Sequence, residues 1–232
     1  ITNQAAKMRY MFGGKARIPL VIRTMIGAGL RAAAQHSDSM YSTFVHIPGL
    51  KVVAPATPAD AKGLLTAAIR DDDPIIFCEH KYMYDDMGPV TEGEYLVPLG
   101  QAAVRREGSD ATIVAISRMG DLALQAAAAL DEEGVSVEIV DPRTLVPLDQ
   151  DTILASIRKT GRLIVVDEDN PRCSVATDLA TLAATQAIEY LCAPVKLVTS
   201  PHTPVPFSPA LEDTYIPTPE RIAAAVRETM MY

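Results

Sequence analysis

The stretch 51–80, KVVAPATPADAKGLLTAAIRDDDPIIFCEH, decides the fold. The apolar runs at 51–56 and 74–80 predict two buried strands, because neither run alternates regularly between polar and apolar residues. Between them, Thr57 is a good N-cap and Pro58 suits the first position of a helix, so the intervening segment is predicted to be helical. A strand, a helix and a second strand in this order are typical of a parallel sheet that is covered on both faces.

The same alternation continues in both directions. Upstream, IPLVIR at 18–23 predicts a further buried strand. Downstream, the periodicity fades in a segment rich in proline, glycine and acidic residues, and strands and helices then alternate again as far as a helix at 218–230. Before that last helix, the proline-rich stretch 201–209 is expected to be extended and stiff.

This pattern divides the chain into two unequal α/β parts. Residues 109–232 are expected to form a complete small α/β domain, and residues 96–108 are expected to be a linker. Residues 1–95 hold few strands for a covered sheet and begin at or inside a helix. We therefore expect them to be the C-terminal part of an α/β domain whose upstream part is missing.

The composition excludes several classes of protein. A chain of 232 residues with 48% hydrophobic and 22% charged residues is globular rather than disordered. The net charge of −8 argues against binding to nucleic acid or to an anionic membrane surface. No apolar run approaches the ~18 residues of a membrane span. The three cysteines have no metal-type spacing, which favours a reduced, cytoplasmic protein.

Motifs that bind phosphate or metal are absent as well. There is no G-x-G-x-x-G after a strand and no G-x-x-x-x-G-K-[ST], and the four histidines show no metal-ligand spacing. If the chain is part of an enzyme, much of the binding equipment must therefore lie on another chain.

Two places nevertheless attract attention as candidate sites. RAAAQHSDSM at 31–40 places His36 in a cluster of short polar residues, where it is either a packed, hydrogen-bonded core residue or a catalytic one. His80 and Lys81 follow a strand end, where sites of α/β proteins lie, but Glu79 beside them favours a local ion pair equally.

The acidic run AIRDDDP at 68–74 also has two interpretations. It is most simply a solvated helix end, although acids at a helix C-terminus are mildly unfavourable. A bound cation would account for the run, because carboxylates and free helix carbonyls suit hard ions. From these residues alone the solvated surface is favoured.

Four longer runs stand out in order along nearly the whole chain: NQAAKMRYMFGGKARIPLVIRTMIGAGLRAAAQHS, PGLKVVAPATPADAKGLLTAAIRDDDPIIFCEHK, VEIVDPRTLVPLD and KTGRLIVVDE. They resemble the beta subunit of the thiamine-diphosphate-dependent first component of 2-oxoacid dehydrogenase complexes. Within that family, FCEHK, NPRCSVATD and SPHTPVPFSPALEDTYIP are most similar to acetoin dehydrogenase beta subunits. Pyruvate and branched-chain relatives usually carry a glycine-rich stretch in place of NPRCSVATD.

The resemblance implies a transketolase-like fold, in which a partial pyrimidine-binding domain precedes a transketolase C-terminal domain. It also implies an α2β2 heterotetramer, in which the alpha subunit holds the diphosphate and magnesium and the beta subunit holds the aminopyrimidine of thiamine diphosphate. The family's essential glutamate, which hydrogen-bonds the aminopyrimidine, lies upstream of Ile1. No cofactor-binding residue is therefore expected on this chain, which should not activate the cofactor alone.

The resemblance also assigns roles to particular residues. His36 matches a family histidine at the mouth of the active site, which assists acyl transfer to lipoamide by donating a proton to the dithiolane. The match further implies a structural potassium ion. Its implied ligands are the carbonyl oxygens of Leu20, Ala68 and Ile69, together with Asp71 and Asp73. Asp73 stands where asparagine is common in the family.

The implied activity is that of a bacterial cytoplasmic acetoin dehydrogenase. Acetoin is cleaved to acetaldehyde, and the acetyl group passes to lipoamide on a dihydrolipoamide acetyltransferase core. Two alternatives remain open: the substrate is pyruvate or a branched-chain 2-oxoacid, or the chain is a non-catalytic scaffold subunit that docks the core.

Overall fold

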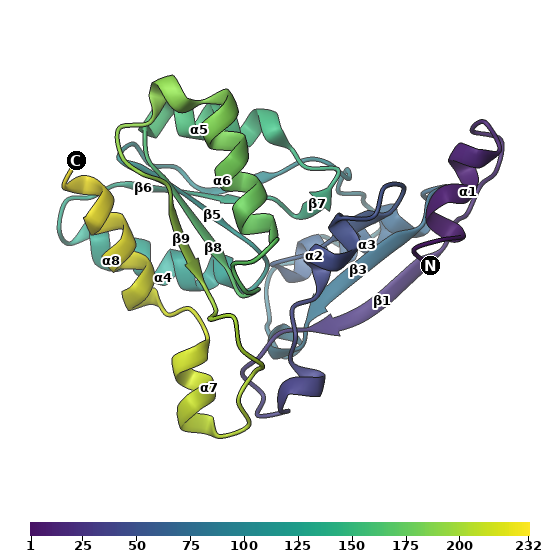
Figure 1. Ribbon diagram of the computed structural model, residues 1–232, viewed down its shortest axis with the longest axis horizontal. Coiled ribbons are helices and arrows are strands. Elements are labelled where there is room, and N and C mark those ends of the chain that lie inside the picture. Colours follow the sequence, from purple (N-terminus) through teal and green to yellow (C-terminus); the bar gives the residue numbers. More distant parts are fainter.

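Two sheets organise the chain in the computed structural model, which describes residues 1–232. Their strand orders are β1–β3–β2–β7 and β4–β6–β5–β8–β9 (Figure 1). The first sheet consists of β1 (Val21–Ile26), β2 (Lys51–Val53), β3 (Ile75–His80) and β7 (Thr144–Val146). The second consists of β4 (Ala103–Arg106), β5 (Ala111–Ala115), β6 (Val137–Asp141), β8 (Leu163–Asp167) and β9 (Lys196–Thr199).

The predicted strand–helix–strand unit forms the centre of the first sheet. β1 and β3 are parallel, with Val21 beside Ile75, and β2 is parallel to β3 on its other side. The connecting helix is α3 (Pro58–Ile69), and the hydroxyl oxygen of Thr57 caps it by accepting the N–H of Asp60 at 3.0 Å. The apolar runs therefore form buried strands, as their composition predicts: one face packs on α3 and the other on the main core cluster.

Helices cover both faces of the second sheet (Figure 1). α5 (Gln150–Thr160) and α6 (Val175–Gln186) lie on one face, and α4 (Met119–Asp131) and α8 (Pro219–Met230) lie on the other. The two faces bury separate clusters of apolar side chains. Parallel pairing of β5, β6, β8 and β9 confirms the expected α/β class.

Shorter elements complete the chain. They are the helices α1 (Ala5–Met11), α2 (Tyr41–Val45) and α7 (Pro209–Tyr215) and the 3-10 turns Ala34–His36, Lys81–Met83 and Ile188–Tyr190. None of the helices has both the length and the apolar character needed to cross a membrane.

Three elements differ from the sequence-based expectation. The predicted linker 96–108 contains β4, a short edge strand that pairs antiparallel with β6 and carries two arginines, so no apolar pattern marks it. β7 comes from the second half of the chain but joins the first sheet, antiparallel to β2. The tail predicted to be extended ends in α7, which uses Pro209 at its first turn.

The two halves share one core and meet at the carboxyl ends of β1, β3 and β8. A single cluster of 23 buried residues contains Ile76 of the first sheet and Val165 of the second. Glu168, which follows β8, contacts Ala28, which follows β1, and His80, the last residue of β3. The carboxyl ends of parallel strands are where α/β proteins usually build their sites, so this edge is the place to look for one.

Candidate functional site

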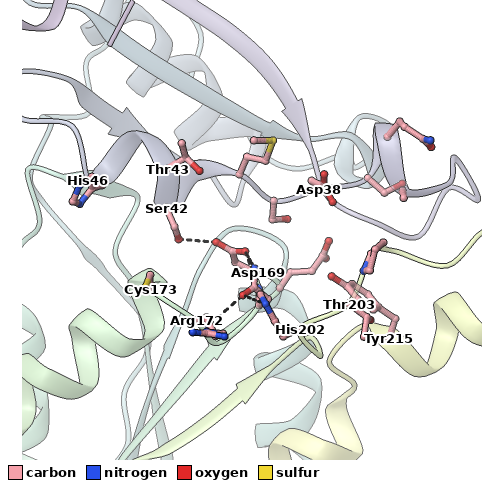
Figure 2. A pocket seen from close by; sticks show the side chains of 18 of the residues that line it. Asp38, Ser42, Thr43, His46, Asp169, Arg172, Cys173, His202, Thr203 and Tyr215 are labelled. Carbon is pink, nitrogen blue, oxygen red and sulfur yellow. Dashed lines mark hydrogen bonds between the residues drawn. The ribbon is translucent and has the colours of Figure 1, made fainter. Parts of the chain in front are cut away.

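A cleft of about 910 Å³ lies between the two halves at this edge. One wall is formed by the segment 34–47, which includes α2. The other wall is formed by residues 168–173, which follow β8, together with 202–204 and Tyr215 (Figure 2). The walls consist of short helices and loops that follow strands of the two sheets, and concave sites of this kind are where proteins usually bind small ligands.

His36 stands at the rim of this cleft. It ends the 3-10 turn, its neighbours Gln35 and Ser37 line the cleft, and its own side chain is exposed. The packed core histidine, the first of the two alternatives, is therefore wrong. The backbone at this point is held by Lys81, whose Nζ donates to the carbonyl of His36 and lies 3.4 Å from the hydroxyl of Ser37.

Acidic side chains at the end of β8 and just after it join the two halves, and Figure 2 shows one of them, Asp169, beside Ser42 in the cleft. Asp167 accepts a hydrogen bond from the hydroxyl of Tyr41, and Asp169 accepts one from the hydroxyl of Ser42 at 2.6 Å. Burial raises the pKa of Asp167 to about 7, although Tyr41 and the N–H of Asp169 both donate to it. Burial also raises the pKa of Asp169.

Glu168 joins the two halves through buried contacts. Its Oε2 lies 2.9 Å from Nε2 of His80, and its Oε1 accepts the N–H of Ala28 at 2.6 Å. Both Glu168 and His80 are only 4% exposed. Glu79 pairs instead with Arg23, at 2.6 and 2.9 Å, so the alternative in which Glu79 neutralises His80 is wrong.

Glu212 is a second buried carboxylate at the junction, and sequence reasoning missed it. It lies on α7, has no exposed surface, and accepts the N–H groups of Gly29 at 2.8 Å and Arg31 at 3.1 Å. Nη1 of Arg31 also donates to it at 2.7 Å. Glu212 and Arg31 are 181 residues apart, so no local pattern connects them. The nearest sequence signal is an acidic pair, Glu212 and Asp213, just after the stretch 201–209, which is predicted to be extended.

The charge of the cleft limits what it can bind. The carboxylates of Asp38, Glu168 and Asp169 line it, opposed by Arg172. An acidic wall disfavours a diphosphate. The chain also has no group of three or more histidine, cysteine, aspartate or glutamate side chains placed to hold a metal ion. A neutral organic group that reacts beside an exposed histidine fits this cleft better than a phosphate does.

The predicted potassium ligands lie at the opposite end of the first sheet from His36. They stand before β1, at the end of α3 and in the loop before β3: Leu20, Ala68, Ile69, Asp71 and Asp73. The carbonyl of Leu20 accepts the N–H of Ile75 at 2.8 Å. Nζ of Lys51 lies 2.6 Å from Asp71 and 3.1 Å from Asp73, and Nη1 of Arg9 lies 2.8 Å from Asp73, so two cations already balance these two carboxylates.

Two protein-family models match the chain. The transketolase pyrimidine-binding domain matches residues 2–86, and the transketolase C-terminal domain matches residues 100–222. Among solved structures, an inactive beta4 tetramer of a split-gene transketolase superposes with a TM-score of 0.77 at 24% identity, covering 93% of this chain and 67% of that one. This likeness shows the fold alone.

Curated relatives are more similar. The beta subunit of acetoin:2,6-dichlorophenolindophenol oxidoreductase from Cupriavidus necator is 60% identical over 99% of this chain and 68% of the relative. Its counterpart from Bacillus subtilis is 55% identical over 99% and 67%. The beta subunit of the pyruvate dehydrogenase E1 component from Rhizobium meliloti is 43% identical over 98% and 50%.

Proposed function

The chain belongs to the transketolase-like beta subunits of thiamine-diphosphate-dependent acetoin and 2-oxoacid dehydrogenases, and from this premise we propose that it is the beta subunit of an acetoin dehydrogenase. The observation that carries the proposal is the 60% and 55% identity to two acetoin oxidoreductase beta subunits, against 43% to a pyruvate dehydrogenase subunit. The location of the distinguishing segment supports it. Asn170, Arg172 and Cys173, in the NPRCSVATD stretch that resembles acetoin dehydrogenases, line the cleft.

The cofactor is shared with a second chain in this proposal. Thiamine diphosphate, when bound, supplies the nucleophilic carbon that cleaves acetoin and takes up the electrons of the broken bond. We assign its diphosphate and magnesium to an alpha subunit in an α2β2 assembly, because this chain has an acidic cleft and no phosphate-binding loop. The acetyl group then passes to a lipoyl group of the acetyltransferase core. Three free cysteines support a reducing compartment, the bacterial cytoplasm.

His36 is the proposed proton donor in acyl transfer. When a lipoyl disulfide takes the acyl group on one sulfur, its S–S bond breaks, and the other sulfur leaves with the bonding electrons and needs a proton. His36 is exposed at the cleft rim, where a lipoyl arm that enters from solvent meets it first. In this proposal the chain contributes two things: the loop that positions His36, and the proton that His36 donates to the departing sulfur.

The substrate is tested with the full-length beta subunit reconstituted with its alpha subunit. Thiamine-dependent reduction of 2,6-dichlorophenolindophenol is measured with acetoin, pyruvate and a branched-chain 2-oxoacid. We expect kcat/KM for acetoin to exceed the others by about tenfold or more, the discrimination that one altered substituent usually gives. Faster turnover of a 2-oxoacid would contradict the proposal. An assembly that binds the acetyltransferase core but turns over none of the substrates would identify a scaffold subunit.

We also propose a structural potassium ion near the N-terminal end of β1. Its oxygen donors suit an alkali cation, and Lys51 and Arg9 already balance the two carboxylates, so the carbonyls would supply most of the binding. Potassium at ~100 times its Kd is expected to stabilise the assembled enzyme by about 2.7 kcal/mol relative to tetramethylammonium at equal ionic strength. Thermal unfolding measures this difference.

A matched pair of variants completes the potassium test. Asp71→Asn should shrink the potassium-dependent shift in unfolding temperature. Asp85→Asn changes an exposed acid outside the ligand set and should leave that shift intact. A wild-type enzyme that unfolds at the same temperature in both salts has no such ion.

A further inference from the structure

The loop that leads from β1 to His36 has an unusual backbone. Gly27 and Gly29 have φ values of +94° and +108°, and Arg31 and Ala33 have φ values of +57° and +62°. Residues with side chains rarely adopt such φ values, because the conformation is strained. Such a conformation persists only where its surroundings hold it, and this loop is held from the other half of the chain.

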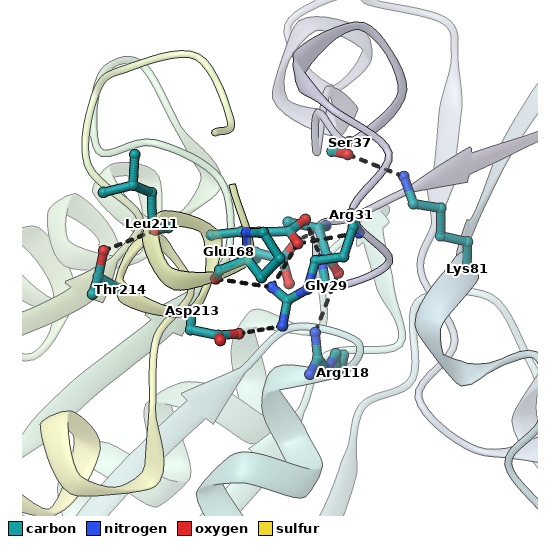
Figure 3. A network of polar contacts seen from close by, with 12 residues as sticks. Gly29, Arg31, Ser37, Lys81, Arg118, Glu168, Leu211, Asp213 and Thr214 are labelled. Atoms are coloured by element: carbon teal, nitrogen blue, oxygen red, sulfur yellow. Dashed lines mark hydrogen bonds and ion pairs between the residues drawn. The ribbon is translucent and has the colours of Figure 1, made fainter. Parts of the chain in front are cut away.

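Two carboxylates bind the backbone of the loop (Figure 3). Glu168 accepts the N–H of Ala28 at 2.6 Å, and Glu212 accepts those of Gly29 at 2.8 Å and Arg31 at 3.1 Å. The guanidinium of Arg31 closes the arrangement by donating to Glu212 at 2.7 Å. Amide groups that could not pair within this irregular loop therefore donate to Glu168, which follows β8, and to Glu212 on α7.

Both carboxylates are buried, and each has groups that replace its hydration. An unpaired buried carboxylate would cost several kcal/mol. Burial alone would raise the pKa of Glu168, but His80 and the N–H of Ala28 outweigh it and hold that pKa below its usual value. The loop backbone and the carboxylates therefore depend on each other: moving one leaves charge or amide groups unpaired.

The far end of the loop carries His36. Its ring is exposed, so no packing of the side chain fixes it, and its position follows from its backbone. Lys81, which directly follows β3, holds the carbonyl of His36, while Glu212 and Glu168 hold the loop at 28–31. The position of the His36 imidazole therefore depends on the hydrogen bonds that hold the loop backbone on both sides.

Resting on the proposed function, we propose that Glu212, together with Glu168, is a positioning residue for His36. By binding the amide groups of the loop, these carboxylates from the second half present the imidazole to the acyl acceptor. Neither carboxylate touches the acceptor itself. Loss of the hydrogen bonds should therefore impair acyl transfer to lipoamide more than the steps that precede it.

The test measures two acceptors in the full-length α2β2 enzyme. Glu212→Gln keeps the size of the side chain but replaces one acceptor oxygen with a donor. We expect the ratio of lipoamide-linked to dye-linked turnover to fall by about 10- to 100-fold, the loss that a displacement near 1 Å produces. In a His36→Ala background the same substitution should lower this ratio no further, because Glu212 acts through His36.

Asp213→Asn is the matched control. Asp213 accepts from Nη2 of the same Arg31 at 2.7 Å, but it is exposed and binds no backbone amide of the loop. It should leave the acceptor ratio unchanged. Equal losses with both acceptors in Glu212→Gln, or losses that multiply with His36→Ala, would overturn the proposal. A wild-type enzyme inactive on acetoin with either acceptor would refute the proposed function instead.

Hydrogen exchange gives a readout that needs no activity. Glu212→Gln should speed exchange of the amides at 28–37, whereas Asp213→Asn should not. If Glu212→Gln fails to assemble, Glu212→Asp retains the charge but withdraws the carboxylate by one methylene group. It should show smaller changes of the same kind. Unaltered exchange at 28–37 in both Glu212 variants would overturn the proposal whatever the substrate proves to be.

Discussion

Replacing His36 with alanine should lower lipoamide-linked turnover by about 10²–10³-fold, the usual contribution of a general acid. Dye-linked turnover should fall much less, because the dye accepts electrons directly and no sulfur has to leave with a proton. The measurement is steady-state turnover of acetoin by the α2β2 enzyme, with formation of S-acetyldihydrolipoamide and bleaching of the dye followed in parallel.

His46 offers a matched control for this prediction. Like His36 it is exposed, but it lines the cleft itself and lies at the end of α2 rather than on the loop after β1. His46→Ala should preserve the ratio between the two acceptors. If His36→Ala lowered both activities equally, His36 would act in cofactor binding or in structure rather than in acyl transfer.

Replacing Gly27 with alanine should destabilise the subunit by about 3–5 kcal/mol, the cost of breaking a buried charged contact in addition to backbone strain. Gly27 has a φ of +94°, and a Cβ there would overlap the imidazole of His80. His80 is buried and held by Glu168, so it cannot move aside without losing that contact. The shift in the midpoint of urea unfolding of the full-length subunit measures the effect.

Gly134→Ala separates the backbone strain from the overlap with His80. Gly134 also has a positive φ, +78°, but nothing lies within 4 Å of the position of its Cβ. Its substitution should cost only the backbone strain, about 1–2 kcal/mol. If the two glycine variants lost the same free energy of unfolding, the contact between His80 and Glu168 would contribute nothing measurable.

The sequence anticipated most of the regular structure, for local reasons. Thr57 and Pro58 begin α3, as predicted, because capping depends on neighbours within one turn. The apolar runs form parallel strands because composition reports burial on both faces. The sequence did not predict β4 and α7. Both are short and polar, and their pairing or burial comes from distant segments.

The candidate site was predicted only in part. Resemblance to a family pointed to His36, whose neighbours Gln35 and Ser37 line the cleft, and its catalytic role stays a prediction. Nothing in the sequence pointed to Glu168 or Glu212, because a glutamate in a polar stretch is ordinarily a solvated surface residue. Their burial results from the docking of the two halves.

By itself, the sequence determined the family and most of the order of strands and helices, since periodicity, caps and long matching runs depend only on residues close together along the chain. Only the tertiary structure decided that Glu212 on α7 and Glu168 after β8 would enclose the backbone of the loop before His36. The physical reason is that burial and the pairing of charges depend on segments that meet only after folding. Residues separated by 181 positions leave no common pattern in the sequence.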